Sequence, residues 1–155
     1  MLLAGCMMKG DEIPSSHHIA RYCKPTDISP ITQELMATAF YLRENIDEYL
    51  STNWLEFFER SSTSDAIDDI RNIFIRKMRS IPAKAQFAVL NIEKMCTYVK
   101  TKYPDHRVLR VVHEPDETNG VLDESHCGIY DMKDDYRSIA ELILQTIDEL
   151  YPARG

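Results

Sequence analysis

Two apolar segments separated by one amphipathic segment constrain the fold of this chain more than any other feature. Residues 86–91 are mostly apolar without alternation, which is typical of a strand covered on both faces. Apolar residues then recur at helical spacing up to Tyr103, and a second apolar segment ends at His113. This order predicts a strand–helix–strand unit at 86–113. A right-handed parallel crossover is the simplest form, and an antiparallel arrangement is the alternative.

Local patterns predict four more elements. Residues 17–23 alternate in polarity, which indicates a strand. Residues 65–79 combine an apolar stripe with acidic residues in the first turns and basic residues in the last turn, so we expect a helix. Residues 54–58 suggest a short aromatic helix, and residues 134–150 carry the apolar face of a last helix, which Pro152 stops.

Two segments are ambiguous. Residues 31–42 fit either a helix or a strand, and we expect a turn followed by a strand at 38–42 that pairs with the strand at 17–23. Residues 127–130 suit either a short edge strand or a loop. These alternatives change the order of strands in the sheet but not the fold class.

The chain length and composition predict one soluble α+β domain. The 155 residues, 44% of them hydrophobic, suffice for a core formed by a small mixed sheet packed with three or four helices. We expect an irregular lead-in over 1–16 and the domain over 17–155. No apolar run approaches the roughly 20 residues that a membrane-spanning helix needs. The net charge of −7 argues against general nucleic-acid binding.

The cysteines indicate a reducing compartment. Cys6, Cys23, Cys96 and Cys127 form no C-x-x-C pair, so we expect free thiols in a cytoplasmic protein. The segment Leu3-Ala4-Gly5-Cys6 resembles the lipidation motif of bacterial lipoproteins. The basic region and the apolar stretch that such a signal requires do not precede it, so we expect an irregular N-terminus instead.

Histidines are the strongest candidates for chemistry. His18 lies near the start of the first strand, His113 ends the strand before an acidic turn, and His126 follows that turn. Converging imidazoles support acid–base catalysis, and Arg21 would hold a phosphate or carboxylate. The catalytic candidates are therefore His18, Arg21, His113 and His126, in a pocket for a phosphate-bearing ligand. The alternative is that these side chains never meet.

Other kinds of site have weaker support. His126 and Cys127 are adjacent, and neighbouring side chains in extended backbone point apart, which disfavours a shared zinc ion. A thiol nucleophile at Cys127 is a further alternative. With five glycines and no glycine-rich phosphate loop, a dinucleotide or P-loop site is disfavoured. The acidic turn at 114–124 suits a solvated loop, with a divalent cation as the alternative. We therefore expect no cofactor and no metal.

An aromatic segment is the candidate surface for a protein partner. Tyr49, Trp54 and Phe57 lie close together in sequence, and tyrosine and tryptophan are enriched at interface hot spots. The alternative is core packing, since Trp54 and Phe58 fall on one face of a helix.

Four short pieces carry a resemblance that spans nearly the whole chain from His17 onward. They are His18-Ile19-Ala20-Arg21-Tyr22, Leu50-Ser51-Thr52-Asn53-Trp54-Leu55-Glu56, Ala88-Val89-Leu90-Asn91 and Ser125-His126-Cys127-Gly128-Ile129. In this order they resemble an uncharacterised family of small bacterial proteins with no assigned activity. The resemblance implies a bacterial single-domain protein and nothing about its chemistry.

The sequence is compatible with two kinds of function. The first is an accessory or interaction component that works with a protein partner. The second is a small histidine-dependent enzyme acting on a nucleotide, an RNA end or another phosphate ester. The enzyme requires its side chains to converge in a concave pocket, whereas the interaction protein requires an exposed apolar surface.

Overall fold

The structure is a computed structural model, and it describes residues 7–155. Cys6 and the motif that ends at it lie outside the described residues, so the expectation for that motif is not tested. None of the helices in residues 7–155 has the length and apolar character that crossing a membrane requires.

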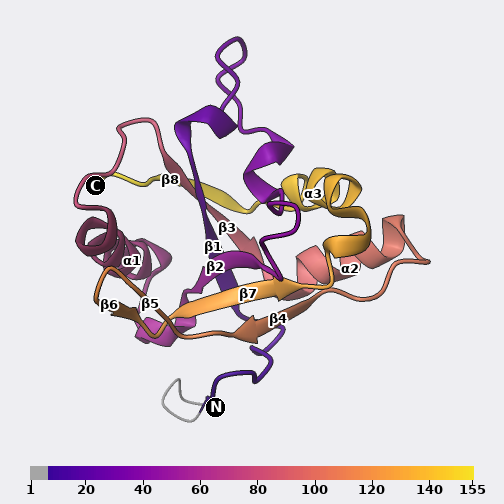
Figure 1. Cartoon of the computed structure of the whole chain (residues 1–155), viewed down its shortest axis with the longest axis horizontal. Helices are drawn as coiled ribbons and strands as arrows, with labels where there is room; N and C mark the ends of the chain where they lie inside the picture. Colours follow the sequence, from indigo (N-terminus) through magenta and orange to yellow (C-terminus); the bar gives the residue numbers. More distant parts are fainter. Residues whose placement is uncertain (1–6) are drawn as a thin grey trace.

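A six-stranded antiparallel sheet forms the centre of the molecule (Figure 1), in the order β4-β7-β2-β1-β3-β8. Its strands are β1 (His18–Cys23), β2 (Leu50–Trp54), β3 (Gln86–Asn91), β4 (Arg110–His113), β7 (His126–Tyr130) and β8 (Glu149–Pro152). A separate hairpin consists of β5 (Asp116–Thr118) and β6 (Val121–Asp123). The helices are α1 (Thr63–Met78), α2 (Ile92–Lys102) and α3 (Tyr136–Leu144), and the short 3-10 turns are η2 (Pro25–Asp27), η3 (Ala37–Phe40), η4 (Glu56–Phe58) and η5 (Lys133–Asp135).

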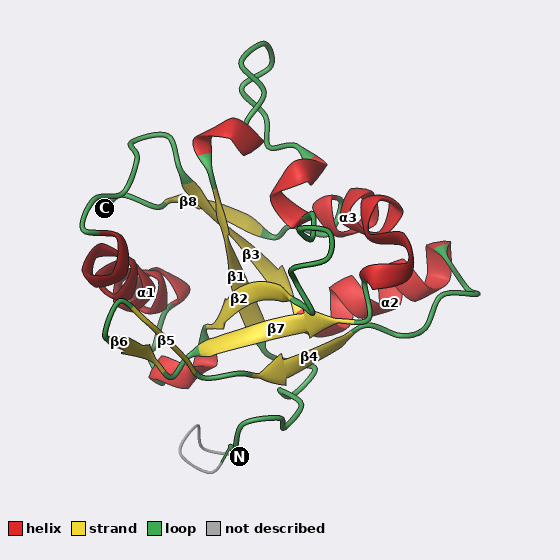
Figure 2. Cartoon of the chain, viewed as in Figure 1, coloured by secondary structure: helices red, strands yellow, loops and turns green. Residues whose placement is uncertain are grey.

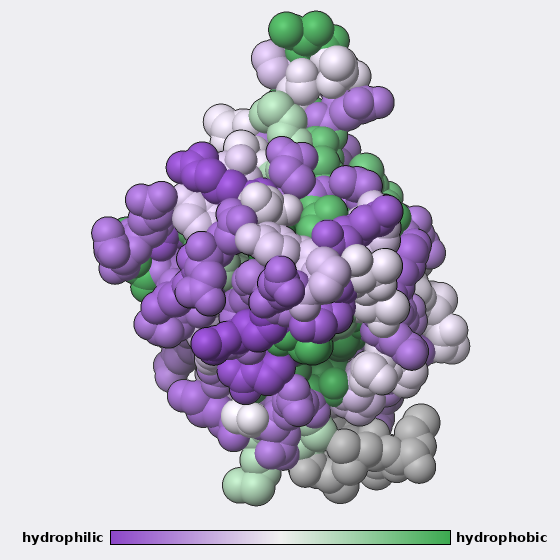
Figure 3. Space-filling view, turned by 90° about the vertical axis from the view of Figure 1, so that its right-hand side faces the viewer, coloured by the Kyte–Doolittle hydropathy of each residue, from purple (hydrophilic) through white to green (hydrophobic). Residues whose placement is uncertain are grey.

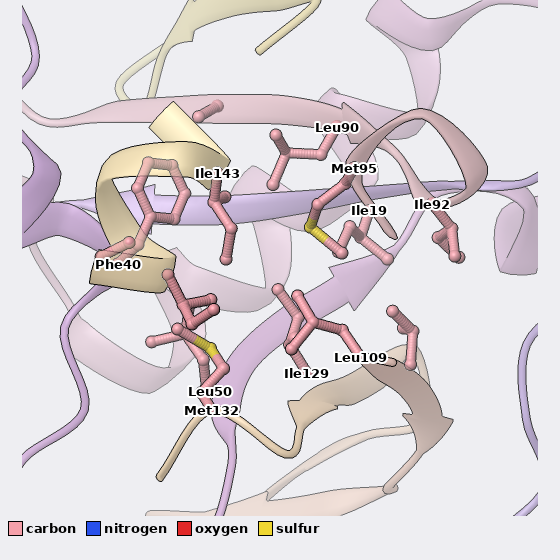
Figure 4. Close-up of a cluster of buried hydrophobic side chains, with 14 of the residues drawn as sticks. Ile19, Phe40, Leu50, Leu90, Ile92, Met95, Leu109, Ile129, Met132 and Ile143 are labelled. Atoms are coloured by element: carbon pink, nitrogen blue, oxygen red, sulfur yellow. The ribbon is translucent and has the colours of Figure 1, made fainter. Parts of the chain in front are cut away.

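Helices cover both faces of the sheet (Figure 2). On one face α2 and α3 pack together, and η3 packs against α3. This face holds the larger core, in which Ile19, Leu50 and Ile129 meet Met95 and Ile143 (Figure 4). On the other face α1 buries its apolar stripe against the sheet in a second core. The single α+β domain with three helices is therefore confirmed, whereas the expected mixed sheet is wrong, because every strand pairing in the sheet is antiparallel.

The helix α1 follows the expectation for 65–79 closely. It begins after Ser62, whose hydroxyl accepts a hydrogen bond from the Asp65 amide as an N-cap. Ile67 and Ile70 are fully buried on its inner face. The helix ends at Met78, and Arg79 takes a φ of 65°.

The strand–helix–strand unit is present as β3, α2 and β4, but its strands are not neighbours. The strands β1, β2 and β7 lie between β3 and β4, and each strand of the sheet pairs antiparallel with its neighbours. The simple parallel crossover between paired strands is therefore wrong. Hydrophobicity placed the three elements along the chain, but it carries no information on which strands insert between them.

Two local expectations before α1 are also wrong. The strand at 38–42 is instead the 3-10 turn η3, and β1 pairs with β2 and β3. The helix at 54–58 is instead the end of β2 followed by η4. The alternation at 17–23 did predict β1 correctly.

In the last third of the chain, the observed elements differ from the expected ones at 127–130 and after Leu144. The segment 127–130 belongs to β7, an interior strand between β2 and β4. The last helix stops at Leu144, where Thr146 closes its final turn by donating its hydroxyl to the Ile143 carbonyl at 2.8 Å. The residues expected to extend the helix to 150 turn back and form β8 at the sheet edge.

The part of the lead-in that the structure describes covers the other edge of the sheet. The Ile13 amide donates to the Val111 carbonyl at 2.9 Å, and the His113 amide donates to the Asp11 carbonyl at 2.8 Å. Ile13 is buried. The edge of β4 is therefore covered by this segment, whereas β8 forms the opposite edge.

Candidate functional site

His18 is held by a carboxylate. Its Nδ1 lies 2.6 Å from Glu56 Oε2, and its backbone amide donates to Glu56 Oε1 at 2.7 Å. Glu56 belongs to η4, directly after β2. The pair thus fixes the turn that follows β2 onto the start of β1.

Arg21 bridges a gap in the sheet. The strands β1 and β2 pair only at Ile19–Trp54 and Ala20–Asn53. Beyond these pairs the Arg21 guanidinium donates from Nε to the Ala39 carbonyl at 2.8 Å and from Nη1 to the Ser51 carbonyl at 2.9 Å. Burial lowers the pKa of Arg21 from its ordinary value. Much of its hydrogen-bonding capacity therefore holds main chain in place.

His113 and His126 point to opposite faces of the sheet. In register, His113 pairs with Cys127 and His126 pairs with Asn53, and successive side chains of β7 alternate between faces. His113 lies against the Trp54 ring, 5.6 Å between centroids, and its Nε2 contacts the Glu124 carbonyl at 2.7 Å. The structure does not bring the three histidines together. A catalytic role for any of them stays a prediction.

Arg21 and His126 share one pocket, on the α1 face of the sheet. We call it the α1 pocket. Its volume is about 310 Å³, at the small end of the range of ligand sites. Its lining residues are Arg21, Tyr22, Ser51, Asn53, Phe74, Lys77, Met78, Asp116, Thr118, Asn119 and His126. They come from β1, β2, α1, β7 and the β5–β6 hairpin, so five separate parts of the chain form its walls.

A buried ionic network forms the base of the α1 pocket. Asp123 is fully buried and accepts hydrogen bonds from Ser125 Oγ at 2.7 Å, Asn53 Nδ2 at 2.8 Å and Lys77 Nζ at 3.1 Å. Burial alone raises the pKa of Asp123, but the donors from Ser125, Asn53 and Lys77 outweigh it, and the pKa is lowered. This carboxylate therefore links the hairpin, α1 and β2.

Asn53 on β2 and His126 on β7 form the floor of the α1 pocket, on the side of the sheet. Each of them has one polar atom that is not used in a hydrogen bond within the protein. His126 Nδ1 lies 2.7 Å from the Glu114 carbonyl, which only accepts, so this nitrogen carries the proton of the neutral ring. Asn53 uses Nδ2 for Asp123 and Ser125. Within residues 7–155, His126 Nε2 and Asn53 Oδ1 have no hydrogen-bond partner, and neither is among the buried atoms that lack one. Each of these atoms therefore keeps some accessible surface, and both residues line the α1 pocket.

Aromatic side chains form one wall. Tyr22 and Phe74 stack with their ring centroids 5.2 Å apart, and Met78 continues this wall along α1. Lys77 Nζ also lies 5.9 Å from the centroid of the Phe74 ring. The hairpin, which contacts α1, adds polar residues to the lining, and Thr118 donates there to Asp116 at 2.8 Å. The α1 pocket therefore combines apolar side chains with polar ones, Asn53 and His126 among them.

The cysteine and metal alternatives find no support. Burial raises the pKa of Cys127 to about 12, and its sulfur lies 3.0 Å from Thr52 Oγ1 inside the core. A thiol with so high a pKa is not a nucleophile at neutral pH. Among the residues that the structure describes, no group of three or more histidine, cysteine, aspartate or glutamate residues is placed to bind a metal ion.

The aromatic interaction candidates are mainly packing residues. Trp54 is 1% exposed and donates from Nε1 to His17 Nδ1 at 3.0 Å, so its ring is not at the surface. Phe57 packs on Trp54 with 6.0 Å between centroids. The Tyr49 ring lies on Gly128, where an added Cβ would sit 2.2 Å from Tyr49 Cδ2. An apolar patch centred on Trp54 is therefore wrong, because the ring is in the core.

Sequence reasoning missed most of the α1 pocket. Asn53 directly precedes the segment expected to be a short aromatic helix, and Lys77 is one of the basic residues in the last turn of the helix expected at 65–79. Asp123 was one of several acidic residues in a turn. A detectable signal was the polar Asn53 directly before Trp54, but only the sheet register shows that it meets His126.

No family model, curated protein or solved structure significantly matches this chain. The function is therefore inferred from its own residues.

Proposed function

We propose that the protein is a binding domain whose small ligand occupies the α1 pocket. The observation that carries the proposal is the pair of open acceptors, Asn53 Oδ1 and His126 Nε2, at the floor of a concave site. Convergent polar groups beside an apolar wall are the usual features of small-molecule sites. Both acceptors are oriented by hydrogen bonds to other parts of the protein, which reduces the cost of ordering them when a ligand binds.

Binding fits this geometry better than the histidine-dependent enzyme. Acid–base catalysis on a phosphate ester needs two or more titratable groups at the same substrate atoms. His126 is the only histidine that lines the pocket. Lys77 is engaged by Asp123, and Ser125 is fully buried against the same carboxylate. The proposal therefore assigns His126 to ligand recognition.

A blocked pocket tests this proposal. Thr118 is exposed at the rim, and Thr118→Trp places an indole there; Thr101→Trp, on α2 at the other face of the sheet, is the matched control. Ligand-observed NMR with a fragment library should give hits that bind the wild type and Thr101→Trp but not Thr118→Trp. A library with no hits, or hits that Thr118→Trp leaves unchanged, would contradict the proposal.

A protein partner is a second candidate, supported at a different place from the one expected. The loop 28–35 protrudes from one end of the molecule, and its tip is hydrophobic in Figure 3. Ile31 is 90% exposed there, although the loop is ordered by a hydrogen bond from the Ser29 amide to the Glu34 carbonyl at 2.8 Å. Ile31→Asp should abolish the binding of a partner that contacts this tip. Ile46→Asp, which changes another exposed isoleucine, is the control and should leave that binding intact. Equal retention by both variants would exclude the loop as the contact.

A further inference from the structure

We infer that the α1 pocket binds a neutral, planar heteroaromatic ring bearing an amino or amide N–H group, as in nucleobases and aromatic amides. This inference rests on the proposed function and names the ligand class of the same site.

Asn53 presents an acceptor because both of its N–H groups are used. Nδ2 donates to Asp123 Oδ2 and to Ser125 Oγ, each at 2.8 Å. The opposite amide orientation would place an oxygen against the Asp123 carboxylate, which only accepts. The network therefore fixes Oδ1 as the atom that faces a ligand.

His126 presents the second acceptor beside it. With Nδ1–H donated to the Glu114 carbonyl, the neutral ring has a bare lone pair at Nε2. Asn53 and His126 are register partners on β2 and β7, so both side chains leave the same face of the sheet from neighbouring positions. A ligand that satisfies both must bring two N–H donors close together. One amino group on a ring carries two such donors.

The ionised groups around the pocket favour a neutral ligand. Lys77 is paired with buried Asp123 at 3.1 Å and with Asp116 at 3.9 Å. The Arg21 guanidinium donates to the Ala39 and Ser51 carbonyls. A phosphate or carboxylate would place its oxygens against two acceptors. The two cations, Arg21 and Lys77, are matched by the two carboxylates of Asp116 and Asp123, so no charge at the site is left for a charged ligand to neutralise. The phosphate-bearing ligand expected from Arg21 is therefore disfavoured at this floor.

The apolar part of the lining favours a ring as ligand. Tyr22, Phe74 and Met78 line the same pocket as Asn53 and His126, so an aromatic ring can bury apolar area against them while its N–H edge meets the two acceptors. The volume of about 310 Å³ suits one small molecule. Because the chain carries a net charge of −7, we assign the ligand to the free small-molecule pool and not to a nucleic-acid strand.

Paired probes that differ in the donor test the inference. Adenosine is compared with purine riboside, which lacks the amino group, and nicotinamide is compared with nicotinate. Isothermal titration should show that the donor-bearing member of at least one pair binds about tenfold or more tightly than its partner, because a ligand without the donor leaves a buried acceptor without a hydrogen bond. Long-range ¹H–¹⁵N spectra should show the His126 Nε2 resonance shifting as that probe binds.

Two variants and one polymer complete the test. Thr118→Trp should abolish binding of the preferred probe. His126→Phe keeps an aromatic ring but removes the acceptor, so the preference within the pair should fall, and its melting temperature shows whether it remains folded. Purine riboside and nicotinate binding as tightly as their partners in the α1 pocket, or phosphate binding there instead, would overturn the ligand class while leaving the proposed function intact. Tighter binding of an oligoadenylate strand than of adenosine would overturn the assignment to a free small molecule. Failure of the fragment library would remove the proposed function itself.

Discussion

The ion pair between Lys77 and Asp123 gives the sharpest test of how this fold is held together. Asp123 has no exposed surface, and only 12% of the Lys77 side chain is exposed. Lys77→Met keeps most of the side-chain volume but leaves the carboxylate without its counter-ion. Removing one partner of a buried pair costs about 3–5 kcal/mol. Because Ser125 and Asn53 still donate to Asp123, we expect a loss of about 3 kcal/mol in the free energy of unfolding.

The control for this change is an exposed pair. Lys94 Nζ lies 2.6 Å from Asp148 Oδ1, closer than Lys77 lies to Asp123, but the Lys94 side chain is 53% exposed. Lys94→Met should cost less than about 1 kcal/mol, because solvent screens such pairs. Urea unfolding at pH 7 compares the two variants. If Lys77→Met lowers the free energy of unfolding by no more than Lys94→Met does, the reasoning is refuted, because burial would then not determine the strength of the ion pair.

The pH dependence provides a second check on the same pair. The pKa of Asp123 is lowered in the folded protein, so its stabilising contribution is present above the unfolded value of 3.8 and is lost as the pH falls through the lower folded value. Lys77→Met removes part of what lowers this pKa. The carboxyl of the variant should therefore protonate at higher pH than that of the wild type, and the stability difference from the wild type should shrink as the pH falls through the pKa of Asp123 in the variant. A difference that stays constant over this range would contradict the assignment to Asp123.

Three further predictions address packing and reactivity. Gly128→Ala should destabilise the protein by about 1–3 kcal/mol in urea unfolding, because the new Cβ overlaps the Tyr49 ring. Adding Tyr49→Ala to this variant removes the overlap and should recover part of the loss. If the losses of the two single variants simply add in the double variant, this explanation is contradicted. Arg21→Lys should lower the melting temperature, because a single ammonium cannot reproduce the geometry of the two guanidinium hydrogen bonds to main-chain carbonyls, and an unchanged temperature would show that they are dispensable. In a Cys6→Ser variant, Cys127 should not react with a thiol reagent at pH 8 until urea unfolds the chain, because burial raises its pKa to about 12. Rapid labelling of Cys127 in the native protein would show that this thiol is accessible.

The sequence predicted best those elements whose patterns are local. The helix α1 was recognisable because its cap, its apolar stripe and its terminal charges agree over sixteen residues. The strand β2 was not, because Leu50, Thr52 and Trp54 face one core while Asn53 belongs to the buried network on the other face. A short strand buried on both faces shows no alternation, and its polar residues then suggest a loop or a helix cap.

The end of the chain was mispredicted for a different reason. Ile147 and Leu150 continue the apolar spacing of α3, so hydrophobicity alone extends the helix. The turn after Leu144 interrupts it, and Leu150 is 47% exposed on β8. A polar residue such as Thr146, which is buried and bonded to the preceding helix, ends α3 without any glycine or proline signal.

The candidate site was hard to predict because its chemistry is determined by residues that do not face the ligand. The Glu114 carbonyl fixes which nitrogen of His126 is an acceptor, and Asp123 fixes which end of the Asn53 amide faces the α1 pocket. Glu114 lies at the start of the turn before β5, and Asp123 lies at the end of β6. The connection between β4 and β7 therefore sets the hydrogen-bonding polarity of the floor, although the floor residues themselves lie in β2 and β7. For this reason the histidines alone suggested proton transfer, whereas the partners of His126 support the recognition role that we propose for it.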